Sequence, residues 1–253
     1  MQFILALIMS FFVGATAGYL GSLMVTKRMA LMGGALGHLT LPGVALALLY
    51  NFDISLGALL FLTFGIILIW FFEQQTQLPT EALTAVVFAS SVAISFLFLP
   101  KEKTIPALIG DIAKISLYPA IITIILATVI FFITKSIYSK MILISISQDV
   151  SIAEKINTKK HNFIYLTCIA LMVALGVRIV GGLMTAALVA IPACTSKNLS
   201  KTLFQYSYGS MLFGGLSCIL GVLIFKFTNI PAGPLIIISS SFLFLISLFF
   251  KKT

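Results

Sequence analysis

Long apolar runs separated by short charged connectors are the feature that most constrains how this chain folds. Of its 253 residues, 60% are hydrophobic and 9% are charged, whereas a soluble domain carries about 25% charged residues. A helix that crosses a bilayer needs about 20 mostly apolar residues. The sequence therefore predicts an all-α polytopic membrane protein with eight or nine transmembrane helices, organised as a single transmembrane domain over residues 1–253.

Charges and turn residues divide the apolar runs into nine candidate spans. The first run has no basic segment before it and extends for more than 20 residues, so it predicts a retained span and not a cleaved signal peptide. The segment 180–194 is short for a crossing, and eight spans result if it is re-entrant. The expected spans lie near residues 3–25, 31–50, 54–72, 82–99, 117–136, 162–178, 180–194, 204–225 and 234–250.

The distribution of lysine and arginine predicts the orientation of these spans. Short cytoplasmic loops carry an excess of both residues, so the richer side and the C-terminus are expected in the cytoplasm. The net charge of +9 then reflects this bias and contact with anionic lipid, and it does not indicate nucleic acid. The basic residues expected on the cytoplasmic side are Lys27, Arg28, Lys140, Lys155, Lys159, Lys160, Lys197, Lys201, Lys251 and Lys252. Those expected on the other side are Lys101, Lys103, Lys114, Arg178 and Lys226.

A histidine within the second expected span is the main candidate for a functional residue. His38 stands four residues before Pro42, and ionisable side chains at membrane depth are rare and commonly functional. Neutral imidazole is a good ligand for zinc, copper, nickel and iron. Two interpretations stay open: His38 is a transient metal ligand, or it is a core residue bonded to a backbone carbonyl or to a hydroxyl such as that of Thr40.

The residues around His38 predict close packing and a bend. Gly33, Gly34 and Gly37 would let a neighbouring helix approach closely, as small residues do in membrane bundles. Pro42 and Gly43 predict a kink in the same span, which would free backbone carbonyls.

The chain contains none of the common catalytic patterns. It lacks the G-x-x-x-x-G-K-[ST] loop of nucleotide hydrolases and the H-E-x-x-H pattern of zinc hydrolases, and its three cysteines have no metal-ligand spacing. We therefore expect a protein that is not an enzyme and holds no resident cofactor. Any transport must be driven by a partner that hydrolyses ATP or by an ion gradient.

Several motifs resemble one family of membrane proteins. Residues 26–46, TKRMALMGGALGHLTLPGVAL, are similar to the pattern RRM-x-x-x-GD-x-x-x-H-x-x-x-PGVA of ABC-type permeases that import zinc, manganese or iron. Four further segments resemble that family in the same order along the chain. They are residues 110–116, 147–160, 181–193 and 230–250.

The resemblance implies a permease of the bacterial plasma membrane, with a fold related to the iron-siderophore and vitamin B12 importer permeases. It implies a homodimer with the pathway between its two copies, a cytoplasmic ATP-binding subunit, an external metal-binding protein, and a divalent cation, zinc or manganese, as cargo. The alternatives are a stand-alone secondary transporter of a small solute and a membrane scaffold that transports nothing.

The resemblance also implies roles for particular residues. His38 would contact the passing cation, and Asp111 would attract cations to an outer vestibule, unless it only caps a helix at the solvent boundary. Residues 147–160 would form a short coupling helix on the ATP-binding subunit, unless they are a solvated loop helix. The apolar positions expected to make that contact are Val150, Ile152, Ala153 and Ile156.

Three departures from the family pattern bear on these roles. Gly34 replaces an aspartate that would share a helix face with His38. Lys155 stands where the family has glycine and Ser151 where it has alanine, and the acidic start of the coupling segment is reduced to Asp149. The sequence alone therefore leaves the metal unidentified.

Overall fold

The computed structural model describes residues 2–29, 32–50, 52, 54–98, 117–228 and 230–250. Within these residues the regular structure is entirely helical, as the composition predicts. The helices are α1 (Gln2–Thr26), α2 (Met32–Leu39), α3 (Leu41–Tyr50), α4 (Ile54–Gln75), α5 (Thr80–Phe98), α7 (Leu117–Ile146), α8 (Gln148–Ala153), α9 (Thr158–Val180), the 3-10 turn η1 (Gly182–Met184), α10 (Thr185–Leu199), α11 (Leu203–Thr228) and α12 (Ala232–Phe249).

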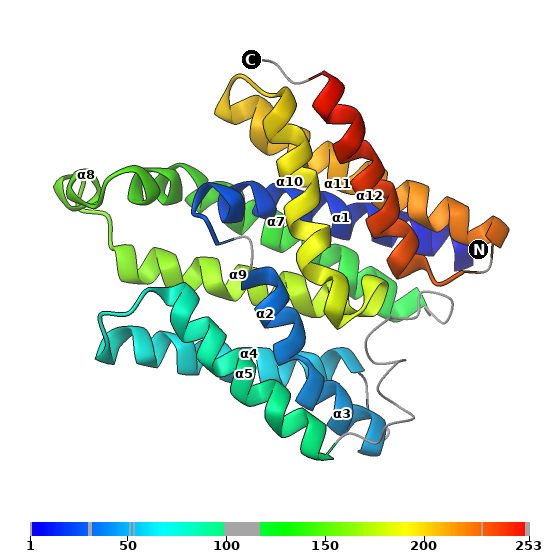
Figure 1. The fold of residues 1–253 in the computed structure, drawn as a ribbon, viewed down its shortest axis with the longest axis horizontal. Coiled ribbons are helices and arrows are strands. Elements are labelled where there is room, and N and C mark those ends of the chain that lie inside the picture. The colour runs from blue at the N-terminus through cyan, green and yellow to red at the C-terminus, as the bar shows by residue number, and fades with distance from the viewer. Residues whose placement is uncertain are drawn as a thin grey trace.

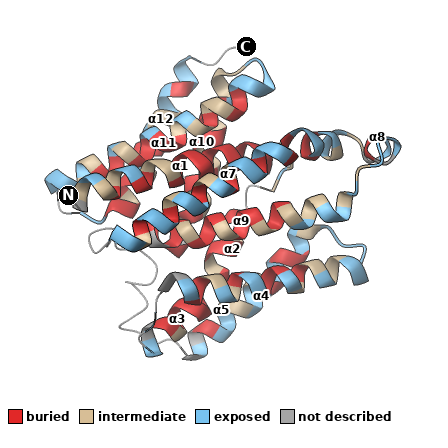
Figure 2. Cartoon of the chain, turned by 180° about the vertical axis from the view of Figure 1, so that it is seen from behind, coloured by how far each residue is buried: buried red, intermediate tan, exposed pale blue. Residues whose placement is uncertain are grey.

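Helix α1 forms the centre of the bundle. It packs against α11, α7, α10 and α9, and Figure 2 shows buried residues along much of its length. Glycines set its closest contact, because a Cβ atom at Gly14 or Gly214 would overlap the backbone carbonyl of the other residue. Gly18 likewise meets the carbonyl of Ser210, so α1 and α11 are antiparallel and approach through small residues.

Helix α9 joins two groups of helices. On one side it packs against α4, and α3, α4 and α5 contact one another there; on the other side it contacts α1, α7, α10 and α12. Figure 1 shows the first group below α9 and the second group above it, with α2 between them. The position of α2 matters because this helix carries His38.

The described residues contain fewer membrane-length helices than the eight or nine expected from the sequence. Among the described residues, six helices are long and apolar enough to cross a membrane: α1, α4, α7, α9, α11 and α12. The segment 31–50 divides into α2 and α3, and α10 has 15 residues. Hydropathy alone detects these apolar segments but not the points at which the backbone breaks.

Side-chain contacts bring the basic residues to one end of the bundle. Lys27 Nζ donates to Asn162 Oδ1 at 3.0 Å, and Lys159 Nζ donates to Gln74 Oε1 at 3.4 Å. These bonds place the end of α1, the end of α4 and the start of α9 together. At the opposite end, Lys226 Nζ lies 4.7 Å from the centroid of the Phe3 ring. This arrangement agrees with the alternating orientation of the spans expected from the sequence.

Candidate functional site

The helix that carries His38 ends at a break with a clear backbone cause. Pro42 has no N–H group, so it cannot donate to the carbonyl of His38 as residue i+4 would in a continuous helix. The backbone N–H of Thr40 bonds instead to the carbonyl of Gly37 at 3.3 Å, and that of Val44 bonds to the carbonyl of Thr40 at 2.9 Å. The kink expected from Pro42 is therefore confirmed, and His38 lies one turn before it.

The imidazole of His38 is half-buried between α2 and α5. Its ring packs against Phe88, with 5.3 Å between the ring centroids and an interplanar angle of 42°. The Thr40 hydroxyl donates to the carbonyl of Gly37 at 2.6 Å and not to His38, and which of the two expected roles His38 has stays a prediction. The structure gives the imidazole no hydrogen-bond partner among the described residues.

The glycines beside His38 pack α2 against η1 and the start of α10. A Cβ atom at Gly37 would overlap the carbonyl of Gly182, and one at Gly33 would lie 3.2 Å from the Cα of Ala186. At Gly34 the nearest atom would be the Cβ of Ala186 at 3.3 Å. The packing role expected for these glycines is confirmed, and Gly34 retains open space on its remaining sides.

One turn on the other side of this contact requires glycine. Gly181 ends α9 with φ 85° and ψ 160°, a conformation that is open in practice to glycine only. Its N–H donates to the carbonyl of Val177 at 2.9 Å. The turn redirects the chain into η1 and so places Gly182 against Gly37.

No described part of this chain assembles a complete metal site. Among the described residues there is no group of three or more histidine, cysteine, aspartate or glutamate side chains that could hold an ion. Asp111 lies outside the described residues, so its expected role stays a prediction. A cation at His38 would need further ligands from the carbonyls at the break or from a second copy of the chain.

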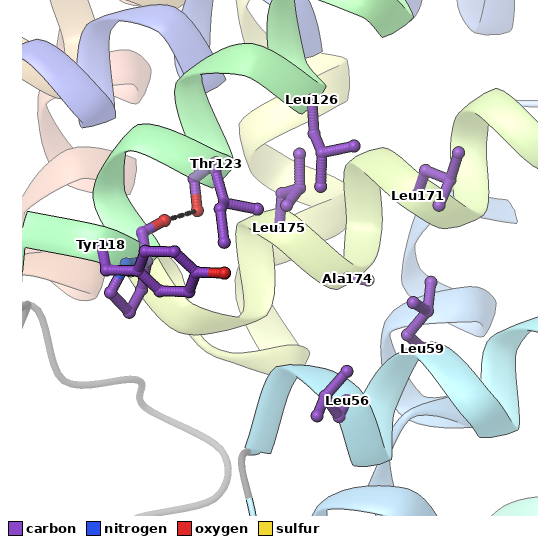
Figure 3. Close-up of a pocket in the computed structure, with 10 residues that line it drawn as sticks. Leu56, Leu59, Tyr118, Thr123, Leu126, Leu171, Ala174 and Leu175 are labelled. Atoms are coloured by element: carbon purple, nitrogen blue, oxygen red, sulfur yellow. Dashed lines mark hydrogen bonds between the residues drawn. The ribbon is translucent and has the colours of Figure 1, made fainter.

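A pocket between α4, α7 and α9 is unsuitable for a cation. It has a volume of about 460 Å³ and lies between Leu59, Leu126 and Leu175 (Figure 3). One polar group in its lining is the hydroxyl of Thr123, which donates to the carbonyl of Pro119 at 2.8 Å and is therefore already bonded. The leucines that line it make it an apolar pocket.

The expected coupling segment forms a separate projection. Within 147–160 the chain makes α8, which packs against α7 and lies at the edge of the molecule (Figure 1). Val150 is 47% exposed and Ala153 is exposed, whereas Ile156 is half-buried; the side chain of Ile152 lies outside the described set. The projection therefore presents apolar surface away from the bundle.

The departure at Lys155 from the family pattern falls on a backbone position that favours glycine. Lys155 has φ 53°, in the left-handed region that favours glycine, and the N–H of Ile156 donates to the carbonyl of Ser151 at 2.9 Å. This is the Schellman arrangement that ends many helices, usually with glycine at the left-handed position. Arg28 has φ 59° and ends α1 in the same way, with Met29 N–H donating to the carbonyl of Met24 at 2.8 Å.

Two features of the site carry no sequence signal. Phe88, which contacts His38, belongs to α5 and lies in an apolar run with no motif of its own. The contact of Gly37 with Gly182 joins residues that are far apart in the chain. A pattern of small residues indicates that packing occurs but does not identify the partner.

An all-helical bundle with several membrane-length helices, a broken helix and an imidazole at the break has the architecture of a membrane permease. The chain belongs to the ABC 3 transport family, whose model matches residues 1–251. It is 29% identical over 244 residues to the high-affinity zinc uptake system membrane protein ZnuB of Haemophilus influenzae, covering 92% of this chain and 91% of that protein.

Two further comparisons agree with this assignment. The chain is 25% identical over 248 residues to the manganese import system permease protein ScaB of Streptococcus parasanguinis, covering 96% of this chain and 89% of that protein. The solved structure of PsaBC from Streptococcus pneumoniae in complex with Fab matches with a TM-score of 0.83 at 24% identity, covering 97% of this chain and 90% of that chain. The chain is thus a multi-pass protein of the bacterial plasma membrane with the permease fold of this family.

Proposed function

We propose that this chain is the permease subunit of an ATP-driven importer that carries a divalent metal ion, zinc or manganese, across the plasma membrane. The observation that supports this most strongly is the family match along residues 1–251. Relatives with similar sequence identity, 29% and 25%, are named for zinc and for manganese, so their names do not distinguish the two ions. The permease would work as a homodimer with a cytoplasmic ATP-binding subunit and an external metal-binding protein.

In this proposal His38 contacts the ion on its way through the membrane. The half-buried imidazole has no hydrogen-bond partner among the described residues and lies beside a helix break. Two copies related by a two-fold axis would supply two imidazoles, and the carbonyl that Pro42 leaves without a helical donor would add an oxygen ligand. A site of this kind binds weakly, which suits a conduit because the ion must also leave.

Coupling would pass through the 147–160 segment. The exposed Val150 and Ala153 of α8 offer an apolar contact for the ATP-binding subunit. Movement of α8 would reach the bundle through α9, which begins a few residues later and packs against both helix groups.

The test is metal uptake by vesicles that contain the permease, the ATP-binding subunit and the binding protein. We expect ATP-dependent uptake of radioactive zinc or manganese, and we expect His38→Ala to lower it at least about tenfold. His161→Ala is the matched control, because His161 lies in the first turn of α9 with its Nδ1 at hydrogen-bonding distance, 2.8 Å, from the backbone carbonyl of Asn157. Gradient-driven uptake by the chain alone would instead identify a secondary transporter, and no flux would indicate a scaffold.

A further inference from the structure

A cleft lies between the last turns of α4 and the first turns of α9, and its lining includes the last residues of the 147–160 segment. It comprises two adjoining hollows of about 500 Å³ and 420 Å³. Both hollows are lined by Trp70, Gln74, Asn157 and Lys159. They form one cleft at the basic end of the bundle.

One wall of the cleft is apolar. Ile67, Trp70 and Phe163 line it, and the rings of Trp70 and Phe163 meet edge to face with 5.8 Å between their centroids. Ile67 is 56% exposed. Ile67 and Trp70 belong to the candidate membrane span Leu56–Gln75, so this wall lies on the membrane-spanning part of α4.

The other wall is polar and mainly basic. Lys159 and Lys160 line it, and Lys159 Nζ is held toward α4 by its hydrogen bond to Gln74 Oε1. The acidic residue of the cleft is Glu73, which accepts a hydrogen bond from the Thr80 hydroxyl at 3.1 Å. The cleft therefore has two lysine side chains on one wall and aromatic and aliphatic side chains on the other.

We propose that this cleft binds one anionic phospholipid from the leaflet that meets the basic end of the bundle. Its phosphate would lie between Lys159 and Lys160, and an acyl chain would lie along Ile67, Trp70 and Phe163. Basic pockets between transmembrane helices bind anionic head groups in this way, and tryptophan prefers the same depth of the membrane. A protein partner fits the cleft less well, because the apolar wall continues into the membrane-spanning part of α4. This proposal is independent of the transported ion.

Trp70 offers a direct test because it is the single tryptophan of the chain. The full chain is reconstituted in phosphatidylcholine bilayers that contain increasing fractions of phosphatidylglycerol with brominated acyl chains, which quench tryptophan on contact. We expect half-maximal quenching of Trp70 at a mole fraction about tenfold lower than with brominated phosphatidylcholine. Equal quenching by the two lipids would overturn the proposal.

Two pairs of lysine variants distinguish lipid binding in the cleft from non-specific attraction of anionic lipid to basic residues. Lys159→Gln with Lys160→Gln should abolish the preference for phosphatidylglycerol. Lys135→Gln with Lys140→Gln removes the same charge from exposed positions on α7 and should preserve the preference. Circular dichroism of each variant checks that it is folded.

Two results with the variants would contradict the assignment. An equal loss of preference in both pairs would show only non-specific attraction to the basic end. If the cleft pair kept the lipid preference but lost the ATP-binding subunit on purification, the cleft would be a protein-docking site.

Discussion

The Nζ atom of Lys27 donates a 3.0 Å hydrogen bond to Oδ1 of Asn162, and this bond joins the end of α1 to the first turns of α9. The same ammonium group lies 5.1 Å from the centroid of the Tyr165 ring. It connects α1, which precedes the helix that carries His38, with α9, which follows α8. Lys27 is therefore a structural link between the two regions that the proposed mechanism must couple.

The burial of Lys27 predicts a dependence of stability on pH. Burial lowers its pKa from 10.5 to about 8, and the carboxylate of Glu73 offsets part of this effect. Between about pH 8 and 10.5 the unfolded chain binds more protons at this residue than the folded chain does, so the free energy of unfolding should rise with pH. Below about pH 8 Lys27 is protonated in both states, so it does not make the free energy of unfolding depend on pH.

The thermal unfolding midpoint in detergent, measured from about pH 7 to pH 11, checks this expectation. The rise due to Lys27 should be at most roughly 3.5 kcal/mol, since the pKa shift from 10.5 to about 8 corresponds to about 1.4 kcal/mol per unit. Lys27→Met should remove it, and Lys140→Met, at an exposed position of α7, should retain it. Identical pH profiles for Lys27→Met and the unmodified chain would contradict the assignment.

Replacement of Lys155 by glycine should stabilise the protein. The left-handed conformation of Lys155, with φ 53°, costs a non-glycine residue about 1 kcal/mol, which glycine avoids. We expect Lys155→Gly to raise the free energy of unfolding by up to about 1 kcal/mol, less the entropy that glycine adds to the unfolded chain. Lys140→Gly, inside α7, should have the opposite effect by a similar amount. The thermal unfolding midpoints check this: Lys155→Gly should unfold at a higher temperature than the unmodified chain and Lys140→Gly at a lower one.

Replacement of Gly34 by aspartate should change the preference for the transported metal. The new carboxylate would share a helix face with His38, and its Cβ would need Ala186 to move by only a few tenths of an ångström, since the two atoms would lie 3.3 Å apart. Carboxylate oxygen favours manganese more than imidazole does. We therefore expect Gly34→Asp to raise the ratio of manganese to zinc uptake.

Gly34→Asn is the control for Gly34→Asp, because the amide has the same size and no charge. An equal change of the uptake ratio in both variants would mean that the added volume, and not a metal ligand, is responsible.

Charged substitutions on α8 should detach the ATP-binding subunit. Val150 is 47% exposed on a helix that projects from the bundle, and burying an unpaired carboxylate in an apolar contact is costly. Val150→Asp with Ile152→Asp should reduce co-purification of that subunit at least about tenfold. Val150→Thr, which preserves the shape, should retain most of it. Unchanged complex yield and uptake in the doubly charged variant would exclude α8 as the coupling contact.

The sequence by itself determined the class of protein and the location of most helices. The requirement for about 20 apolar residues per crossing is local, so the run from Phe3 onward predicts α1 and the run at 204–225 predicts α11 without any knowledge of their neighbours. The motif around His38 and Pro42 is also local. It indicates the family, the kink and the packing role of the glycines without reference to any other helix.

The tertiary structure decided everything that depends on which helices meet. His38 faces Phe88, Gly37 meets Gly182, and Lys27 reaches Asn162; each pair joins residues that are distant in the chain. The number of membrane-length helices likewise depended on where α2 ends and on the short α10. The physical reason is that hydropathy measures the transfer of a segment into lipid, which is nearly independent of its partners, whereas contacts between helices arise from the shapes of both surfaces.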